Sequence, residues 1–136
     1  TNSRSEKGRA LEAHPFAEAV FHWDSLHRQL RVRGGITHLD ASDTRAYFHS
    51  RPRGSQLAAW ASDQSEAAAS REAMDRRFAE VEARFKDMEV ELPPHWMGYR
   101  LGPSRMEFWQ EGDFRFHDRI VYVRSDSGWA CERLYP

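Results

Sequence analysis

The sequence has few of the features that mark secreted, membrane-spanning or nucleic-acid-binding proteins. Its 136 residues include one cysteine, Cys131, so no internal disulfide can form. No apolar run approaches the ~20 residues that cross a bilayer. Lys and Arg nearly balance Asp and Glu, which leaves a net charge of -1, whereas domains that bind nucleic acids are usually strongly basic. We therefore expect a soluble, cytoplasmic protein with no nucleic-acid or membrane partner.

Several motifs that would announce a familiar chemistry are also missing. There is no Gly-x-Gly-x-x-Gly or Walker loop, which argues against a nicotinamide Rossmann site and a P-loop. No Gly-x-Ser-x-Gly elbow suggests a serine hydrolase. The seven histidines show no paired spacing typical of metal ligands, and one cysteine cannot build a thiolate zinc site. We expect no metal.

The patterns that are present predict one α+β domain built around antiparallel strands. The chain is of single-domain size, and its hydrophobic content of 40% is enough for one modest core. Gly102-Pro103 and Ser125–Gly128 have turn chemistry. Closely spaced strands on both sides of a helical insert favour a small antiparallel barrel over a doubly wound sheet. The expected helices are Glu6–Ala13, a helix from Asp40 or Ser42 through Phe48, Ser55–Ala61 and Arg71–Lys86; the expected strands are Phe16–Trp23, Gln29–Ile36, Trp96–Leu101, Arg105–Gln110, Asp118–Arg124 and Trp129–Leu134.

Charged and aromatic side chains gather most densely in the stretch Glu107–Arg119, on either side of a turn expected at Gly112. If this stretch is extended, alternation places Arg115, His117 and Arg119 on one face. Such a face suits a small anionic ligand, because arginine makes forked bonds to phosphate or carboxylate and histidine changes charge near neutral pH. A solvated edge strand with scattered charge explains the same spacing equally well.

Two other places could hold an anion. Ser5 is a plausible N-cap for the first helix, which puts Lys7 beside its backbone amides. Tyr47 and Arg51 lie four residues apart at the end of another helix, so both can face one ligand. An ordinary surface helix and a capped turn with solvated arginines are the alternatives, and from the residues alone these are favoured.

The order of the motifs resembles the pyridoxine/pyridoxamine 5'-phosphate oxidase family along essentially the whole chain. Its C-terminal signature is matched by Phe108-Trp109-Gln110, Arg115-Phe116-His117-Asp118-Arg119 and Glu132-Arg133-Leu134-Tyr135-Pro136. Its central motif is matched by Ser50-Arg51-Pro52-Arg53-Gly54-Ser55-Gln56, Trp60-Ala61-Ser62 and Gln64-Ser65. Thr1-Asn2 with Ser5, Lys7 and Gly8 resembles its flavin-phosphate loop.

This resemblance implies an FMN-binding split barrel that forms a homodimer with the flavin sites at the interface. It also implies oxidation of pyridoxine or pyridoxamine 5'-phosphate by O2 to pyridoxal 5'-phosphate, with release of H2O2. FMN would accept a hydride equivalent from C4' of the substrate. The cofactor carries the redox chemistry, and the protein supplies position and charge.

The resemblance assigns a role to individual residues. Arg115 and His117 are implied to lie over the reacting carbon and to act as the catalytic pair. The substrate phosphate is implied to contact Tyr47, Arg51 and Ser55, and FMN to contact Lys7, Gln29, Gln64, Ser65, Trp109 and Arg119. Glu6 stands where the family usually has a basic residue, which is expected to weaken flavin binding.

The family pattern also sets an expected organisation. Residues 1–90 correspond to the central flavin-binding part with a helical insert, and residues 91–136 to a C-terminal, dimerisation-type region. The chain begins at Thr1 without methionine, and the resemblance places a further N-terminal segment before it. Two alternatives remain: an FMN-dependent oxidase of another ring substrate, as in phenazine biosynthesis, and a non-catalytic dimer that binds flavin or pyridoxal phosphate.

Overall fold

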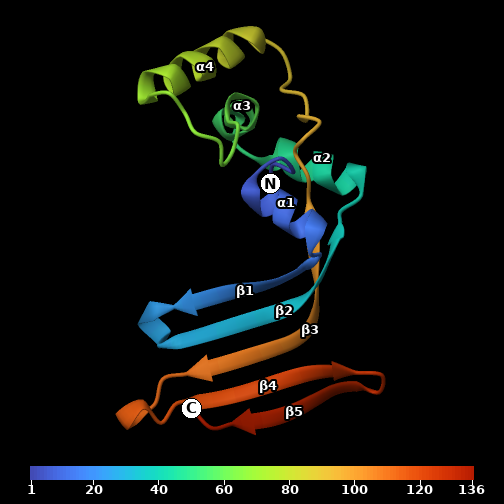
Figure 1. Cartoon of the computed structure of the whole chain (residues 1–136), viewed down its shortest axis with the longest axis vertical. Coiled ribbons are helices and arrows are strands. Elements are labelled where there is room, and N and C mark those ends of the chain that lie inside the picture. The colour runs from blue at the N-terminus through green and yellow to red at the C-terminus, as the bar shows by residue number, and fades with distance from the viewer. The chain divides into compact units, whose positions relative to one another are not determined.

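Four α-helices and a five-stranded antiparallel sheet make up the computed structural model, which describes residues 1–136 (Figure 1). The chain divides into two units. The first comprises 1–14 and 38–99, and the second comprises 15–37 and 100–136. The predicted class, mainly β with helices, is confirmed. None of the helices is both long enough and apolar enough to span a membrane.

The first unit contains the helices α1 (Glu6–Ala13), α2 (Ala41–Ser50), α3 (Arg53–Ala61) and α4 (Arg71–Arg84). The first of them begins at Ser5, the cap expected from the sequence, and α4 is capped by Ser70 in the same way. The Ser5 hydroxyl accepts a hydrogen bond from the Gly8 N–H at 3.1 Å, and the Ser70 hydroxyl accepts one from the Ala73 N–H at 3.2 Å. Each bond satisfies a donor that the first turn of a helix leaves without a partner.

The core of this unit is a cluster of five buried side chains from α2, α3 and the segment after α4: Phe48, Leu57, Phe85, Val90 and Trp96. Phe78 and Val81 of α4 pack against this cluster, whereas Met74 of the same helix is 49% exposed. The C-terminal half of α4 therefore packs on the core.

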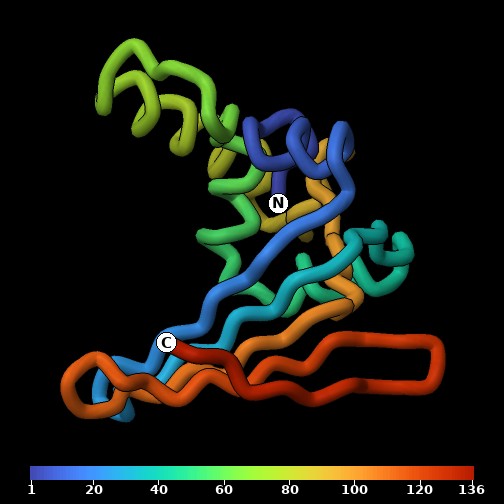
Figure 2. The backbone as a smooth tube through the Cα atoms, turned by 60° about the horizontal axis from the view of Figure 1, so that its bottom comes forward, coloured from blue at the N-terminus to red at the C-terminus, as the bar shows by residue number.

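The second unit is built around the sheet, in the order β1 (Phe16–Trp23), β2 (Arg28–His38), β3 (Tyr99–Gln110), β4 (Asp118–Ser125) and β5 (Gly128–Leu134) (Figure 2). Strands that are neighbours in the chain are neighbours in the sheet. A short 3-10 turn at Asp24–Leu26 joins β1 to β2, and the expected turn around Ser125–Gly128 joins β4 to β5.

The prediction of a turn at Gly102-Pro103 is wrong, because β3 runs through both residues without a break. The six expected strands are therefore five. Pairing with β2 explains the difference: a Cβ atom at Gly34 would overlap the carbonyl oxygen of Gly102. The two glycines allow the backbones of β2 and β3 to approach closely, a use of glycine that resembles turn chemistry in the sequence.

The glycine pair in β2, Gly34-Gly35, forms no bulge. The register of β1 and β2 is continuous from Phe16 opposite Gly35 to Trp23 opposite Arg28, with no extra residue on either strand. Gly34 is needed for the contact with β3 rather than for a kink.

Candidate functional site

The start of the chain is fastened to the segment before β3 by backbone hydrogen bonds. The Thr1 amino group donates to the Met97 carbonyl at 2.7 Å, and the Met97 N–H donates to the Thr1 carbonyl at 2.7 Å. Asn2 forms an isolated antiparallel bridge with Trp96. A tight turn then leads into α1, where a Cβ at Gly8 would lie 2.5 Å from the Asn2 carbonyl oxygen. These contacts fix the first turn of α1, which carries Lys7.

Positive charge accumulates beside this turn. Burial lowers the pKa of the Thr1 amino group, and the charges of Lys7 and Arg51 lower that pKa further. The charges of Lys7 and Arg51 are therefore both felt at the Thr1 amino group. Lys7 is exposed and makes no hydrogen bond or ion pair. A cluster of unpaired cations is a favourable environment for an anion.

Arg51 follows α2 as its C-terminal cap, and its guanidinium lies on aromatic rings. Its Cζ lies 5.3 Å from the ring centre of Trp96 and 6.0 Å from that of Phe48. Tyr47 stacks on the same Trp96 ring at 6.0 Å. The Nη1 atom of Arg51 is buried and has no hydrogen-bond partner. A buried cationic donor without a partner is costly, so this atom needs an acceptor that the chain itself does not provide.

Arg53, two residues later, is used differently. Its guanidinium donates to the Phe85 carbonyl at 2.6 Å and to the Met88 carbonyl at 2.9 Å. It therefore caps the C-terminal end of α4. The sequence places both arginines in one motif, and the structure shows that Arg51 has an unpaired nitrogen whereas Arg53 is bound to backbone carbonyls.

Ser55, Gln64 and Ser65 complete the predicted residues of the first unit. Ser55 lies in the first turn of α3, and its hydroxyl has no partner. The Gln64 Oε1 accepts from the Asn2 N–H at 3.3 Å and from the Thr1 hydroxyl at 3.4 Å, which leaves the amide NH2 free to donate. Ser65 has a left-handed backbone with φ of 75°. Both residues line an open pocket of about 770 Å³ between α3 and α4.

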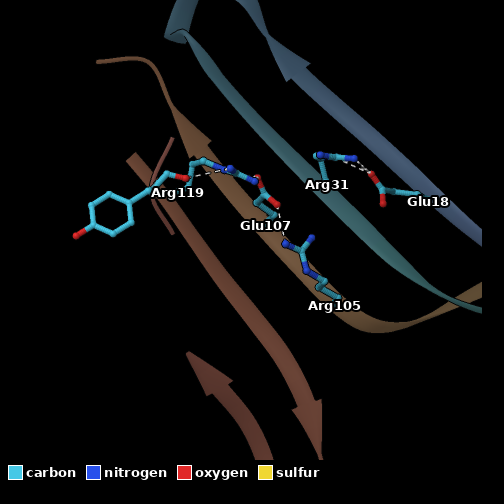
Figure 3. Close-up of polar contacts among 6 residues, drawn as sticks. Glu18, Arg31, Arg105, Glu107 and Arg119 are labelled. Carbon is cyan, nitrogen blue, oxygen red and sulfur yellow. Dashed lines mark hydrogen bonds and ion pairs between the residues drawn. The ribbon is translucent and has the colours of Figure 1, made fainter. Parts of the chain in front are cut away.

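In the second unit, the most buried acid of the chain holds two arginines. Glu107 on β3 is 2% exposed. Its Oε1 accepts from Arg119 Nε at 2.9 Å and lies 2.7 Å from Arg119 Nη2, while its Oε2 accepts from Arg105 Nη2 at 2.8 Å (Figure 3). Burial alone would raise the pKa of Glu107, but the hydrogen bonds from the two arginines outweigh it and leave that pKa below its ordinary value.

Trp109 and His117 lie together at the end of β3. Their ring centres are 4.7 Å apart. The Gly112 N–H donates to His117 Nδ1 at 3.2 Å, so the neutral imidazole carries its proton on Nε2. His117 also lines an open pocket of about 480 Å³ with the C-terminal residues Leu134–Pro136. In this arrangement, His117 presents an N–H donor to a ligand.

The expectation that Arg115, His117 and Arg119 share one face of a strand is wrong. Arg115 lies in a 3-10 turn (Asp113–Arg115), and β4 begins only at Asp118. Phe114 and Arg115 both have left-handed backbones, with φ of 55° and 65°, which few non-glycine residues adopt. Side chains in this turn do not alternate between two faces as they do in a strand, so the spacing does not place the three residues on one face. Arg115 is exposed and has no partner within the chain.

Gln29, near the start of β2, is half-buried and lies opposite His22 in the sheet. Its side-chain amide makes no hydrogen bond within the chain. The predicted residues are thus divided between the units: Lys7, Tyr47, Arg51, Ser55, Gln64 and Ser65 lie in the first, and Gln29, Trp109, Arg115, His117 and Arg119 lie in the second.

Sequence reasoning missed Glu107 as a member of the site. It was counted among the charges of the stretch, but nothing in its spacing distinguishes a buried carboxylate from an exposed one. The available signal was its place on β3 two residues from Trp109 and from Arg105, since alternate residues of a strand share a face. Its pairing with Arg119 depends on the β3–β4 register, which sets Glu107 opposite Val121 and Trp109 opposite Arg119.

Comparison with known proteins identifies the chain's relatives. Residues 1–85 match the family described as pyridoxamine 5'-phosphate oxidase, and residues 96–136 match the pyridoxine 5'-phosphate oxidase C-terminal dimerisation region. Proteins named pyridoxine/pyridoxamine 5'-phosphate oxidase from Caulobacter vibrioides and Myxococcus xanthus are each 48% identical over the whole chain, which covers 61% and 66% of their lengths. The one from Rubrobacter xylanophilus is 49% identical, with 63% of its length covered. The chain thus spans about three fifths of the length of these curated relatives.

Two solved structures share the fold. PhzG from Burkholderia lata 383, solved in complex with tetrahydrophenazine-1-carboxylic acid, superposes with a TM-score of 0.92 at 32% identity, over 100% of this chain and 66% of that one. An FMN-binding, pyridoxamine 5'-phosphate oxidase-related protein from Nostoc punctiforme gives 0.73 at 17% identity, over 100% of this chain and 71% of that one. The predicted split-barrel class is confirmed, and the chain belongs to the pyridoxamine 5'-phosphate oxidase family.

Proposed function

We propose that this chain forms the FMN- and substrate-binding part of an oxidase that converts pyridoxine or pyridoxamine 5'-phosphate into pyridoxal 5'-phosphate. The observation that carries the proposal is the buried, unpaired Nη1 of Arg51. A phosphate oxygen would supply the missing acceptor, with the partner-free hydroxyls of Tyr47 and Ser55 as further donors. The aromatic face of Trp96 beneath the guanidinium restricts its direction.

Groups suited to FMN are present as well. Lys7, the free amide NH2 of Gln64 and the Ser65 hydroxyl are donors for its phosphate, and the Gln29 amide can both donate to and accept from the edge of the ring. Trp109 supplies a flat apolar surface, and Arg119 a fixed positive charge that favours electron transfer to the ring. When bound, FMN would supply the two-electron acceptor for the hydride from C4', and O2 would be the final oxidant, leaving as H2O2.

The chain's own residues would orient the substrate. His117 would donate from Nε2 to an oxygen or nitrogen on the reacting carbon, because Nδ1 already accepts from Gly112. For His117 to take the substrate's proton at Nε2, the imidazole must first shift its own proton from Nε2 to Nδ1, which releases the Gly112 N–H. Arg115 lies in the 3-10 turn, two positions before His117 in the sequence, and its guanidinium is the other unpaired donor of this region.

Two substitutions test the catalytic assignment. Arg115→Leu and His117→Ala should each lower the turnover of pyridoxine 5'-phosphate by about a hundredfold while changing the FMN dissociation constant by less than about threefold. Arg124→Leu, in β4, is the matched control because no role is proposed for it, and its turnover should stay at the wild-type level. Wild-type turnover in both Arg115→Leu and His117→Ala would remove these residues from the mechanism.

A second candidate has support from one observation. The match to PhzG, with a TM-score of 0.92, keeps open an FMN-dependent oxidase of a phenazine-type ring. Such a carboxylated ring carries no phosphate for the Tyr47, Arg51 and Ser55 donors. Competition kinetics separate the two: pyridoxine 5'-phosphate should be the better substrate, and preference for tetrahydrophenazine-1-carboxylic acid would favour the second candidate.

The proposal includes a homodimer, organised as one split-barrel domain. Residues 1–90 would form its central flavin-binding part with the helical insert, and 91–136 its dimerisation-type region. The match of 96–136 to a dimerisation region supports this. So does the exposure of large apolar side chains on the sheet, because a monomer rarely leaves so many in water; these are Phe16, Val20, Phe21, Trp23, Phe108, Val123 and Trp129.

A further inference from the structure

We propose that Glu107 is a positioning residue that orients the guanidinium of Arg119 toward FMN. The inference rests on the proposed function, because it takes Arg119 to contact the cofactor. It adds a residue to which neither the sequence motifs nor the family resemblance gave a role. Glu107 would not touch FMN itself and would act only through Arg119.

The hydrogen bonds of Arg119 define its orientation from two sides. Nε and Nη2 form a fork on Oε1 of Glu107, at 2.9 and 2.7 Å. Nη1 donates to the Tyr135 carbonyl at 3.1 Å. A forked pair fixes the plane of a guanidinium as well as its place. These contacts use three of the five N–H donors of arginine, so two remain free to meet a ligand.

The electrostatics of the cluster also depend on Glu107. Arg105 and Arg119 carry like charges and share one carboxylate (Figure 3). Without it, the two guanidiniums repel each other and Arg119 loses its fork. With it, the cluster has one net positive charge, held in place by a carboxylate whose lowered pKa keeps it ionised at neutral pH.

Another ion pair of the sheet has neither a buried carboxylate nor a second arginine. Arg31 Nε donates to Glu18 Oε1 at 2.6 Å across β1 and β2 (Figure 3). The side chains of Arg31 and Glu18 are 40% and 27% exposed. No contact with FMN is proposed for either. Exposed pairs of this kind contribute little to stability. Glu18→Gln is therefore a matched control, since it removes an ion-paired carboxylate from the same sheet.

A double-mutant cycle distinguishes positioning from general stabilisation. The dissociation constant of FMN is measured by flavin fluorescence for wild type, Glu107→Gln, Arg119→Ala and the double variant, with folding of each checked by circular dichroism. Glu107→Gln should weaken FMN binding about tenfold in the wild-type background and less than about twofold in the Arg119→Ala background. Glu18→Gln should leave the constant unchanged.

Two outcomes overturn the inference while leaving the proposed function in place: equal weakening by Glu107→Gln in both backgrounds, or no weakening in either. Failure of the wild-type chain to bind FMN overturns the proposed function, and the inference with it. If Glu107→Gln does not fold, Glu107→Asp is used in the same cycle. It keeps the charge and shortens the side chain, so it should weaken binding about threefold, again only where Arg119 is present.

Discussion

Among single residues, Arg51 and Arg53 differ in whether their guanidinium groups have hydrogen-bond partners within the chain. Arg51 has a buried nitrogen with no partner, whereas Arg53 donates to the Phe85 carbonyl at the end of α4 and to the Met88 carbonyl after it. Replacing an unpaired buried donor removes a desolvation cost, and replacing a paired one removes hydrogen bonds. The two substitutions should therefore have opposite consequences.

Arg51→Met should weaken binding of pyridoxine 5'-phosphate at least about tenfold and change the free energy of unfolding by less than about 1 kcal/mol. Arg53→Met should lower the free energy of unfolding by about 2 kcal/mol and leave ligand affinity near the wild-type value. Calorimetric titration and urea unfolding measure both quantities. A large loss of stability in Arg51→Met with unchanged affinity would contradict the assignment of its Nη1 to a phosphate.

Tyr99 provides a prediction in the alkaline range. Burial, followed by the hydrogen bond of its hydroxyl to Glu12, raises its pKa from 10.0 to about 12. Between these values the unfolded chain releases the phenolic proton and the folded chain keeps it, so stability should fall as the pH rises through this window. Tyr99→Phe should remove this part of the alkaline loss. Tyrosinate absorbance checks the account directly, and titration of all four tyrosines near 10 would refute it.

At the scale of elements, β2 and β3 depend on their close approach at Gly34. A Cβ there would overlap the Gly102 carbonyl oxygen, so Gly34→Ala must separate the strands. We expect it to lower the free energy of unfolding by about 2–3 kcal/mol, as overpacking does. Gly35→Ala is the control, because its Cβ would meet only the Pro15 carbonyl oxygen at 4.0 Å. Thermal unfolding compares them, and equal melting temperatures would show that the approach is not tight.

The same elements show what the sequence could and could not predict. Helices beginning after Ser5 and Ser70 were predictable because a serine cap and an apolar period are local signals. Gly102-Pro103 was misread because strand pairing is not local, and the close approach to Gly34 involves a residue far away in the chain. A turn at Gly112 was predictable from the glycine, but its extension through Asp113–Arg115 was not, since no glycine marks the left-handed residues.

In the candidate site too, local signals were predictable from the sequence and tertiary contacts were not. The motifs identified Arg51, Arg119 and His117 as residues of interest. They did not show that Arg51 lacks a partner, that Arg119 is held by Glu107, or that Gly112 fixes the tautomer of His117. Each of these facts depends on which backbone groups and side chains tertiary packing brings together, and the linear spacing does not contain them.

At the scale of the whole molecule, assembly and cofactor binding should be linked. If the flavin sites lie at a dimer interface, FMN binds the dimer more tightly than the monomer, so dilution should release it. Sedimentation should show a dimer whose dissociation is shifted to lower protein concentration by added FMN. A monomer that binds FMN with an affinity independent of protein concentration would contradict the interfacial site.

If this chain uses FMN to oxidise a B6 phosphate, as we propose, the substrate must reduce the bound flavin. An anaerobic titration of the FMN-loaded chain with pyridoxine 5'-phosphate, followed by flavin absorbance, tests this. The flavin absorbance should be bleached and should recover when air is admitted. Flavin that binds but is bleached by neither pyridoxine nor pyridoxamine 5'-phosphate would contradict the account and favour a flavin-binding protein or an oxidase of another ring.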